Sequence, residues 1–160
     1  MSPRAVPCRV FEEVQTGDEL PPRRRDITLT DLVMYAAATW DFHRYHYDEA
    51  FARAHGHRAP FVDGQMIGAL LAGDLMDWGG AEAFVRRLTY RTRATVYPGD
   101  GVVSRGVVTG KTAENGRALV LCTLSMAKMD GTEIMRDATA ALELPTRDDV
   151  VGAHRTGEPR

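Results

Sequence analysis

The feature that most constrains the fold is a run of apolar residues from Gln65 to Trp78, QMIGALLAGDLMDW. Its first nine residues are apolar on nearly every side of a helix, so the segment predicts a helix that is buried all round. Gly79 and Gly80 follow, and glycine at this place ends helices. A buried helix needs other elements to enclose it, and the remainder of the chain has to supply them.

The second half of the chain has the alternating pattern of strands. The predicted strands cover residues 88–96, 102–110, 117–129 and 132–144. Pro98-Gly99-Asp100, Asn115-Gly116 and Asp130-Gly131 separate them and are typical turn sequences. We therefore expect a four-stranded antiparallel meander, whose strands exceed the usual length of about five or six residues and so curl. The prediction is an α+β fold in which a long curved sheet wraps around the apolar helix.

Two further helices are predicted in the first half of the chain. Thr28 and Asp31 have the spacing of a capping box, and apolar residues then recur at helical spacing as far as Trp40. This pattern predicts a helix of about three turns. A short helix is expected over residues 48–54 and a loop over residues 56–64.

Two segments are predicted to lie outside the regular elements. Arg23, Arg24 and Arg25 follow two prolines and indicate a charged, solvated connector, with contact to a phosphate-bearing ligand as the alternative. From Pro145 onward the chain is polar and has no periodicity, which predicts a disordered tail. We therefore expect a single domain over residues 1–144, followed by a tail over residues 145–160.

Composition narrows the class of protein. The 160 residues are 44% hydrophobic and 26% charged, as in one globular domain, and the formal net charge of −2 provides no basic surface for nucleic acid. No apolar run approaches the roughly 18 residues of a membrane span, and the N-terminus lacks the apolar core of a signal peptide, so a cytoplasmic protein is expected. Cys8 and Cys122 form no disulfide or zinc pattern.

Four of the five histidines, His43, His46, His55 and His57, fall within fifteen residues. Asp41 precedes His46 by five residues, about 140° apart on a helix, so the two converge only if the helix ends near residue 40 and the chain bends. A converging carboxylate and imidazole can hold a water molecule and move its protons. The spacing alone leaves ordinary loop residues as the alternative. The histidines match no standard metal template, so no metal is expected.

The run from Tyr35 to Arg53 resembles the hydratase motif of the MaoC-like dehydratases, also called the (R)-specific enoyl-CoA hydratase family, roughly G-D-x-N-P-x-H-x-D. The flanking sequences are similar as well, and the resemblance covers about residues 10–144. The flanks that carry it are residues 11–20, 60–66, 86–93 and 96–100. The family has the hot-dog fold, a long antiparallel sheet wrapped around one helix.

The resemblance implies that Asp41 and His46 are the catalytic pair. The reaction it implies is the reversible hydration of a trans-2-enoyl thioester to a 3-hydroxyacyl thioester, with coenzyme A or an acyl carrier as part of the substrate and no further cofactor. As water attacks C3, the thioester oxygen becomes enolate-like and needs a hydrogen-bond donor. The backbone N–H of Gly64 or Gln65, at the start of the apolar helix, is the expected donor.

The chain departs from the family motif at three positions. His43 and Arg44 stand where the family usually has Asn and Pro, and Asp63 stands where His often precedes the glycine. His43 is expected either to position the loop, to bind substrate or to do neither. The pattern Asp41-Phe-His43-x-x-His46 resembles that of the family branch that acts on steroid and other bulky acyl-CoA substrates. Asp63 is a candidate substrate-binding residue, and the sequence does not indicate which part of the substrate it contacts.

Hot-dog proteins pair through exposed faces and edges, so a homodimer or a heterodimer with a second hot-dog subunit is expected. Some relatives are heterodimers in which one subunit supplies Asp and His, and this chain would be that subunit. The alternatives are a hot-dog thioesterase, a relative that adds an amine to the enoyl thioester, and a non-catalytic acyl-binding partner. Arg91 and Arg93 are expected either to meet the phosphates of coenzyme A or to solvate a sheet face.

Overall fold

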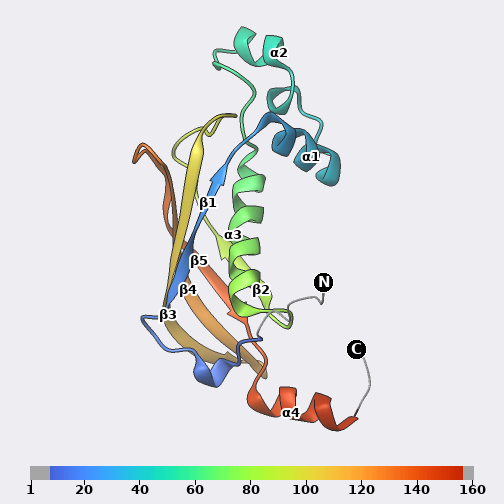
Figure 1. Ribbon diagram of the computed structural model, residues 1–160, viewed down its shortest axis with the longest axis vertical. Coiled ribbons are helices and arrows are strands. Elements are labelled where there is room, and N and C mark those ends of the chain that lie inside the picture. Colours follow the sequence, from blue (N-terminus) through green and yellow to red (C-terminus); the bar gives the residue numbers. More distant parts are fainter. Residues whose placement is uncertain (1–7, 157–160) are drawn as a thin grey trace, which may run out of the picture.

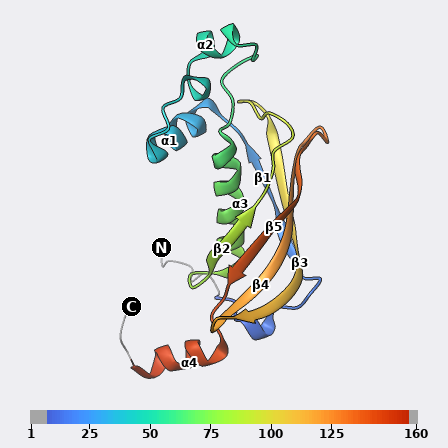
Figure 2. The ribbon, with the colours of Figure 1, turned by 180° about the vertical axis from the view of Figure 1, so that it is seen from behind.

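The computed structural model describes residues 8–156 and has a curved, five-stranded antiparallel sheet with one long helix along one face (Figures 1 and 2). This confirms the predicted α+β hot-dog architecture. The helices are α1 (Leu29–Thr39), α2 (Glu49–Ala54), α3 (Gly64–Gly79) and α4 (Arg147–Thr156), with 3₁₀ turns at Phe11–Glu13 and Arg44–His46. The strands are β1 (Glu19–Asp26), β2 (Phe84–Thr89), β3 (Gly101–Glu114), β4 (Arg117–Lys128) and β5 (Glu133–Glu143).

The apolar helix α3 packs into the core through one face. The buried side chains of this face are Met66, Ile67, Leu71, Leu75 and Trp78. They join a core cluster with inward-facing residues of the sheet such as Val120 and Leu142. The expectation of a helix buried all round is wrong, because Ala69 and Met76 are exposed. Among the helices and strands of residues 8–156, none covers that face of α3 (Figure 1).

The strand order β1-β3-β4-β5-β2 corrects the predicted meander. β3, β4 and β5 are consecutive hairpin neighbours as expected, but β2 pairs with β5 at the opposite edge. The predicted strand 88–96 is wrong beyond residue 89. After Thr89 the chain leaves the sheet, and Val96 is buried and accepts a hydrogen bond from the Val62 amide at 2.8 Å.

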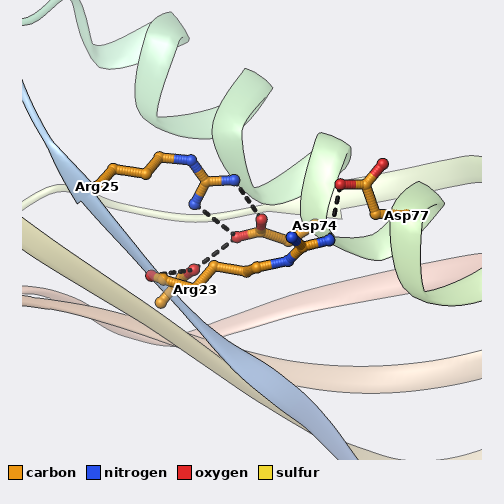
Figure 3. A network of polar contacts seen from close by, with 5 residues as sticks. Arg23, Arg25, Asp74 and Asp77 are labelled. Atoms are coloured by element: carbon orange, nitrogen blue, oxygen red, sulfur yellow. Dashed lines mark hydrogen bonds and ion pairs between the residues drawn. The ribbon is translucent and has the colours of Figure 1, made fainter.

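The arginines that were predicted to form a solvated connector belong to the edge strand β1. β1 pairs with β3, and its register shifts between Leu20 and Arg23, where the two prolines lie. Proline is tolerated there because an edge strand has N–H positions that need no partner. Arg23 and Arg25 point to α3 and form ion pairs with its acidic residues Asp77 and Asp74 (Figure 3).

The predicted disordered tail is corrected by helix α4. Thr146 and Asp149 form a reciprocal cap in which the Thr146 amide and hydroxyl donate to the Asp149 carboxylate at 2.9 and 2.6 Å. This local capping outweighs the missing apolar periodicity. The described residues exclude 1–7 and 157–160. The first range is part of the N-terminus for which no signal peptide was predicted, and the second is the end of the predicted tail. No helix within residues 8–156 is long and apolar enough to cross a membrane.

Candidate active site

The end of α1 creates the bend that brings the candidate catalytic residues together. The helix starts at the predicted cap, where the Thr28 side chain accepts from the Asp31 amide, and ends at Trp40 with φ 58°. This left-handed conformation costs a non-glycine residue about 1–2 kcal/mol and turns the chain out of the helix. Asp41 therefore stands outside α1, and a 3₁₀ turn over Arg44–His46 follows.

Asp41 and His46 meet in a narrow pocket at the end of the molecule where α1 and α2 lie (Figure 1). One ligand atom each from Asp41, His46 and Asp63 lies within 4.8 Å of the other two. Asp41 Oδ1 also accepts from the His43 amide at 3.2 Å, which holds the carboxylate in place. The residues that line the pocket are Leu32, Tyr35, Ala36, Asp41, His46, Asp63 and Met66.

The orientation of His46 is set by a backbone carbonyl. Its Nδ1 lies 2.8 Å from the carbonyl oxygen of Phe61. Because a carbonyl oxygen only accepts, Nδ1–H donates to it, and in the neutral ring Nε2 carries the lone pair. His46 is partly buried and also packs edge-on against the Phe61 ring. Nε2 is therefore the nitrogen that can accept a proton.

The two predicted oxyanion donors differ in availability. Asp63 is the N-cap of α3, and its Oδ1 accepts from the Gln65 amide at 3.0 Å. The Gly64 amide has no acceptor among residues 8–156. A Cβ built on Gly64 would have no heavy atom within 4 Å, so a ligand can approach this peptide closely. Gly64 is thus the better placed of the two donors.

Two tyrosines near Asp63 were not identified from the sequence. Burial raises the pKa of the Tyr35 hydroxyl, and the charge of Asp63 raises it further; both effects act on the pKa of Tyr90 as well. Tyr90 donates to the Gly64 carbonyl at 3.0 Å and lies against Gly68, where a Cβ would be 2.3 Å from its oxygen. The helical spacing of Tyr35 and Leu32 is a signal that could have identified Tyr35.

The other members of the histidine cluster lie outside the pocket lining. His43 is exposed, stacks on Tyr45 with ring centroids 4.8 Å apart, and accepts from the Tyr45 amide at 3.4 Å, so it shapes the loop. His55 and His57 belong to an aromatic cluster around the same tyrosine. The group of described side chains with the spacing of a metal site is instead Asp41, His46 and Asp63.

A groove adjoins the pocket at Gly64. It has a volume of about 250 Å³. Its lining residues are Phe61, Val62, Gly64, Ile67, Thr92, Arg93, Ala94, Thr95 and Val96. Arg91 and Arg93 line a neighbouring recess, and Arg93 Nε lies 3.6 Å from a carboxylate oxygen of Glu133. Arg93 therefore lines both the groove and the recess, and Arg91 lies beside the groove; both belong to the segment that has left the sheet.

The chain matches a protein-family model and is similar to solved structures. The family model of the MaoC like domain matches residues 12–128. A chain of the ChsH1–ChsH2 complex from Mycobacterium tuberculosis is 27% identical, with a TM-score of 0.71, and the alignment covers 81% of this chain and 98% of that one. A comparison with curated proteins found no match.

Two solved hydratases have the same fold. The (R)-hydratase from A. caviae involved in PHA biosynthesis is 21% identical with a TM-score of 0.73, over 84% of this chain and 99% of that one. The R-hydratase PhaJ1 from Pseudomonas aeruginosa is 22% identical with a TM-score of 0.76, over 86% of each chain.

Proposed function

The chain belongs to the MaoC-like domain family, and on that premise we propose that it catalyses the reversible hydration of a 2-enoyl thioester to a 3-hydroxyacyl thioester. The observation that carries the proposal is the convergence of Asp41 and His46 in one pocket. Gly64 directly follows Asp63, which lines the same pocket, and its backbone N–H has no acceptor in the described chain. These are the groups that addition of water to a polarised double bond requires.

The chemistry follows from the positions of these groups. Asp41 and His46 hold the water, and the pair removes one of its protons as the oxygen bonds to C3 of the substrate. The electrons of the double bond shift toward the thioester oxygen, to which the Gly64 N–H donates. The pair then delivers a proton to C2. Acid–base catalysis of this kind contributes about 10²–10⁴-fold, and an oxyanion donor about 10²–10³-fold.

The groove beside Gly64 is the proposed path of the thioester arm. A thioester whose oxygen lies at Gly64 would extend its arm along the groove toward Arg91 and Arg93. Guanidinium groups bind phosphate oxygens in bidentate fashion. Coenzyme A and a phosphopantetheine carrier both present phosphate at the end of such an arm, so both belong to the proposed substrate class, and no further cofactor is needed.

A second hot-dog subunit is part of the proposal. The uncovered face of α3 and the edge strands β1 and β2 are surfaces that such a subunit can cover. The ChsH1–ChsH2 structure is a complex, which supports a partner that is either a second copy or a different chain. With its own Asp41 and His46, this chain would be the active subunit of either assembly.

The proposal is tested with the purified protein, alone and with candidate partner chains. Crotonyl-CoA and longer enoyl thioesters are supplied, and loss of enoyl absorbance is followed in parallel with release of free thiol. Asp41→Asn and His46→Ala are each expected to lower the hydration rate by at least about 100-fold, whereas His55→Ala, outside the pocket, keeps it. A wild-type protein that hydrates the enoyl thioesters no faster than these two variants refutes the proposal. Thiol release without hydration identifies a thioesterase, and loss of enoyl absorbance only with added ammonium identifies an amine-adding enzyme.

A further inference from the structure

One carboxylate oxygen of Asp63 is not used by the cap that this residue forms. Oδ1 accepts from the Gln65 amide at 3.0 Å. Oδ2 is buried and has no hydrogen-bond partner among residues 8–156. A buried acceptor without a donor costs about 1–3 kcal/mol, and native structures seldom leave one unpaired. A bound molecule that brings a donor to this oxygen would remove the cost.

The neighbours of Asp63 restrict what that molecule is. Asp63 lines the same pocket as Asp41 and His46, and one ligand atom of each lies within 4.8 Å of the others. A single oxygen atom can lie within about 2.8 Å of three points so spaced, which is hydrogen-bond distance. All three groups are acceptors when the His46 ring is neutral. A water molecule at this point has two O–H donors, so it can donate one to Asp63 and the other to one member of the Asp41–His46 pair.

The two O–H bonds of a water that adds to C3 have different fates. One breaks, its proton passes to the Asp41–His46 pair, and the oxygen bonds to C3. The other is retained and becomes the O–H of the 3-hydroxyl group. We propose that Asp63 Oδ2 accepts this retained O–H, an assignment that rests on the proposed hydratase function.

This contact orients the water without any proton passing to Asp63. With one O–H directed to the catalytic pair and the other to Asp63, a lone pair of the water faces C3. In the dehydration direction, the same oxygen of Asp63 holds the 3-hydroxyl group of the substrate while the bond from C3 to oxygen breaks. Asp63 therefore contacts the reacting oxygen throughout and distinguishes a 3-hydroxyacyl thioester from its saturated analogue.

The experiment uses Asp63→Asn and Asp63→Ser, which keep an oxygen to cap the Gln65 amide but remove the second acceptor. The kcat for hydration of crotonyl-CoA is expected to fall about 10- to 100-fold, with KM within about twofold. In calorimetric titrations, the affinity for 3-hydroxybutyryl-CoA is expected to fall about tenfold or more, and that for butyryl-CoA to stay unchanged. Thermal unfolding of the variants checks that they are folded.

Asp48→Asn is the matched control. Asp48 caps α2 through the Phe51 amide at 2.9 Å and lies outside the pocket, so the same substitution there should leave kcat and both affinities unchanged. The assignment of Asp63 is overturned if its variants keep the wild-type kcat, or if they lose affinity for both ligands equally. A wild-type protein that hydrates no enoyl thioester overturns the proposed function, and this assignment with it.

Discussion

Two ion pairs join the same two elements, β1 and α3, in different surroundings, and we expect them to differ sharply in their effect on stability (Figure 3). Asp74 is 8% exposed and accepts two hydrogen bonds from Arg25, as well as one from the Ser104 hydroxyl at 2.5 Å. Asp77 accepts from Arg23 at 2.8 Å, but the two side chains are 62% and 47% exposed. The first pair is largely withdrawn from water, whereas the second remains in it.

The size of the effect follows from what each substitution leaves behind. Asp74→Ala leaves the Arg25 guanidinium, only 27% exposed, without its counter-charge, together with the buried Ser104 hydroxyl. Removing one partner of a buried pair costs about 3–5 kcal/mol, whereas an exposed pair contributes about 0–1 kcal/mol. At about 2–4 °C per kcal/mol for a chain of this size, Asp74→Ala should lower Tm by about 6–20 °C and Asp77→Ala by at most about 4 °C.

Urea denaturation at neutral pH measures the free energy of unfolding of both variants. The double variant Arg25→Met with Asp74→Leu is a second control, because replacing both charges by apolar side chains is often neutral or stabilising. An Asp74→Ala variant that loses no more stability than Asp77→Ala would refute the reasoning. Such a result would mean that water reaches the Arg25–Asp74 pair in solution.

Three further outcomes are expected. Burial raises the pKa of the Cys122 thiol to about 12, so iodoacetamide at pH 8 should label Cys8 in the folded protein and both cysteines only after denaturation. Burial would raise the pKa of Asp100, but the Lys128 ammonium at 2.7 Å and nearby donors outweigh it and hold that pKa below its ordinary value. The stabilisation is therefore present at neutral pH and lost as the pH falls below about 4, so the unfolding free energies of wild type and Asp100→Asn should converge between pH 7 and pH 3. Because the proposed chemistry uses only side chains and a backbone N–H, dialysis against EDTA should leave the hydration rate unchanged, and a loss that zinc or another divalent ion restores would contradict it.

Local signals in the sequence were sufficient for much of the fold. The capping box at Thr28, the helix signal over residues 48–54 and the turn at Asn115-Gly116 each act over a few residues, and the elements they delimit are present. The position of β2 could not be obtained in this way. Alternation predicts a strand but not its neighbour, and the pattern continues past Thr89 because Val96 is buried against another segment rather than within the sheet.

In the candidate site, too, residues that depend on local sequence were predictable and residues that depend on long-range packing were not. Asp41 and His46 were recognisable as part of a motif because both lie in one short segment, five residues apart. Tyr90 was not, because its contact with Gly64 depends on a long-range crossing of the chain over Gly68, which leaves no room for a side chain there.

Asp63 is the residue for which sequence reasoning is least decisive. An aspartate immediately before an apolar helix is an expected N-cap, and the structure has this cap. A cap uses only one carboxylate oxygen, and whether the second lies in water or in the interior depends on the tertiary packing around it. Here α1 and its bend bring Tyr35 and Asp41 to the same pocket, and the second oxygen is buried with no donor from the described part of the chain. The same residue type at the same helix position can therefore serve only as a cap in one fold and contact the reacting water in another, and the surroundings of its free oxygen distinguish the two.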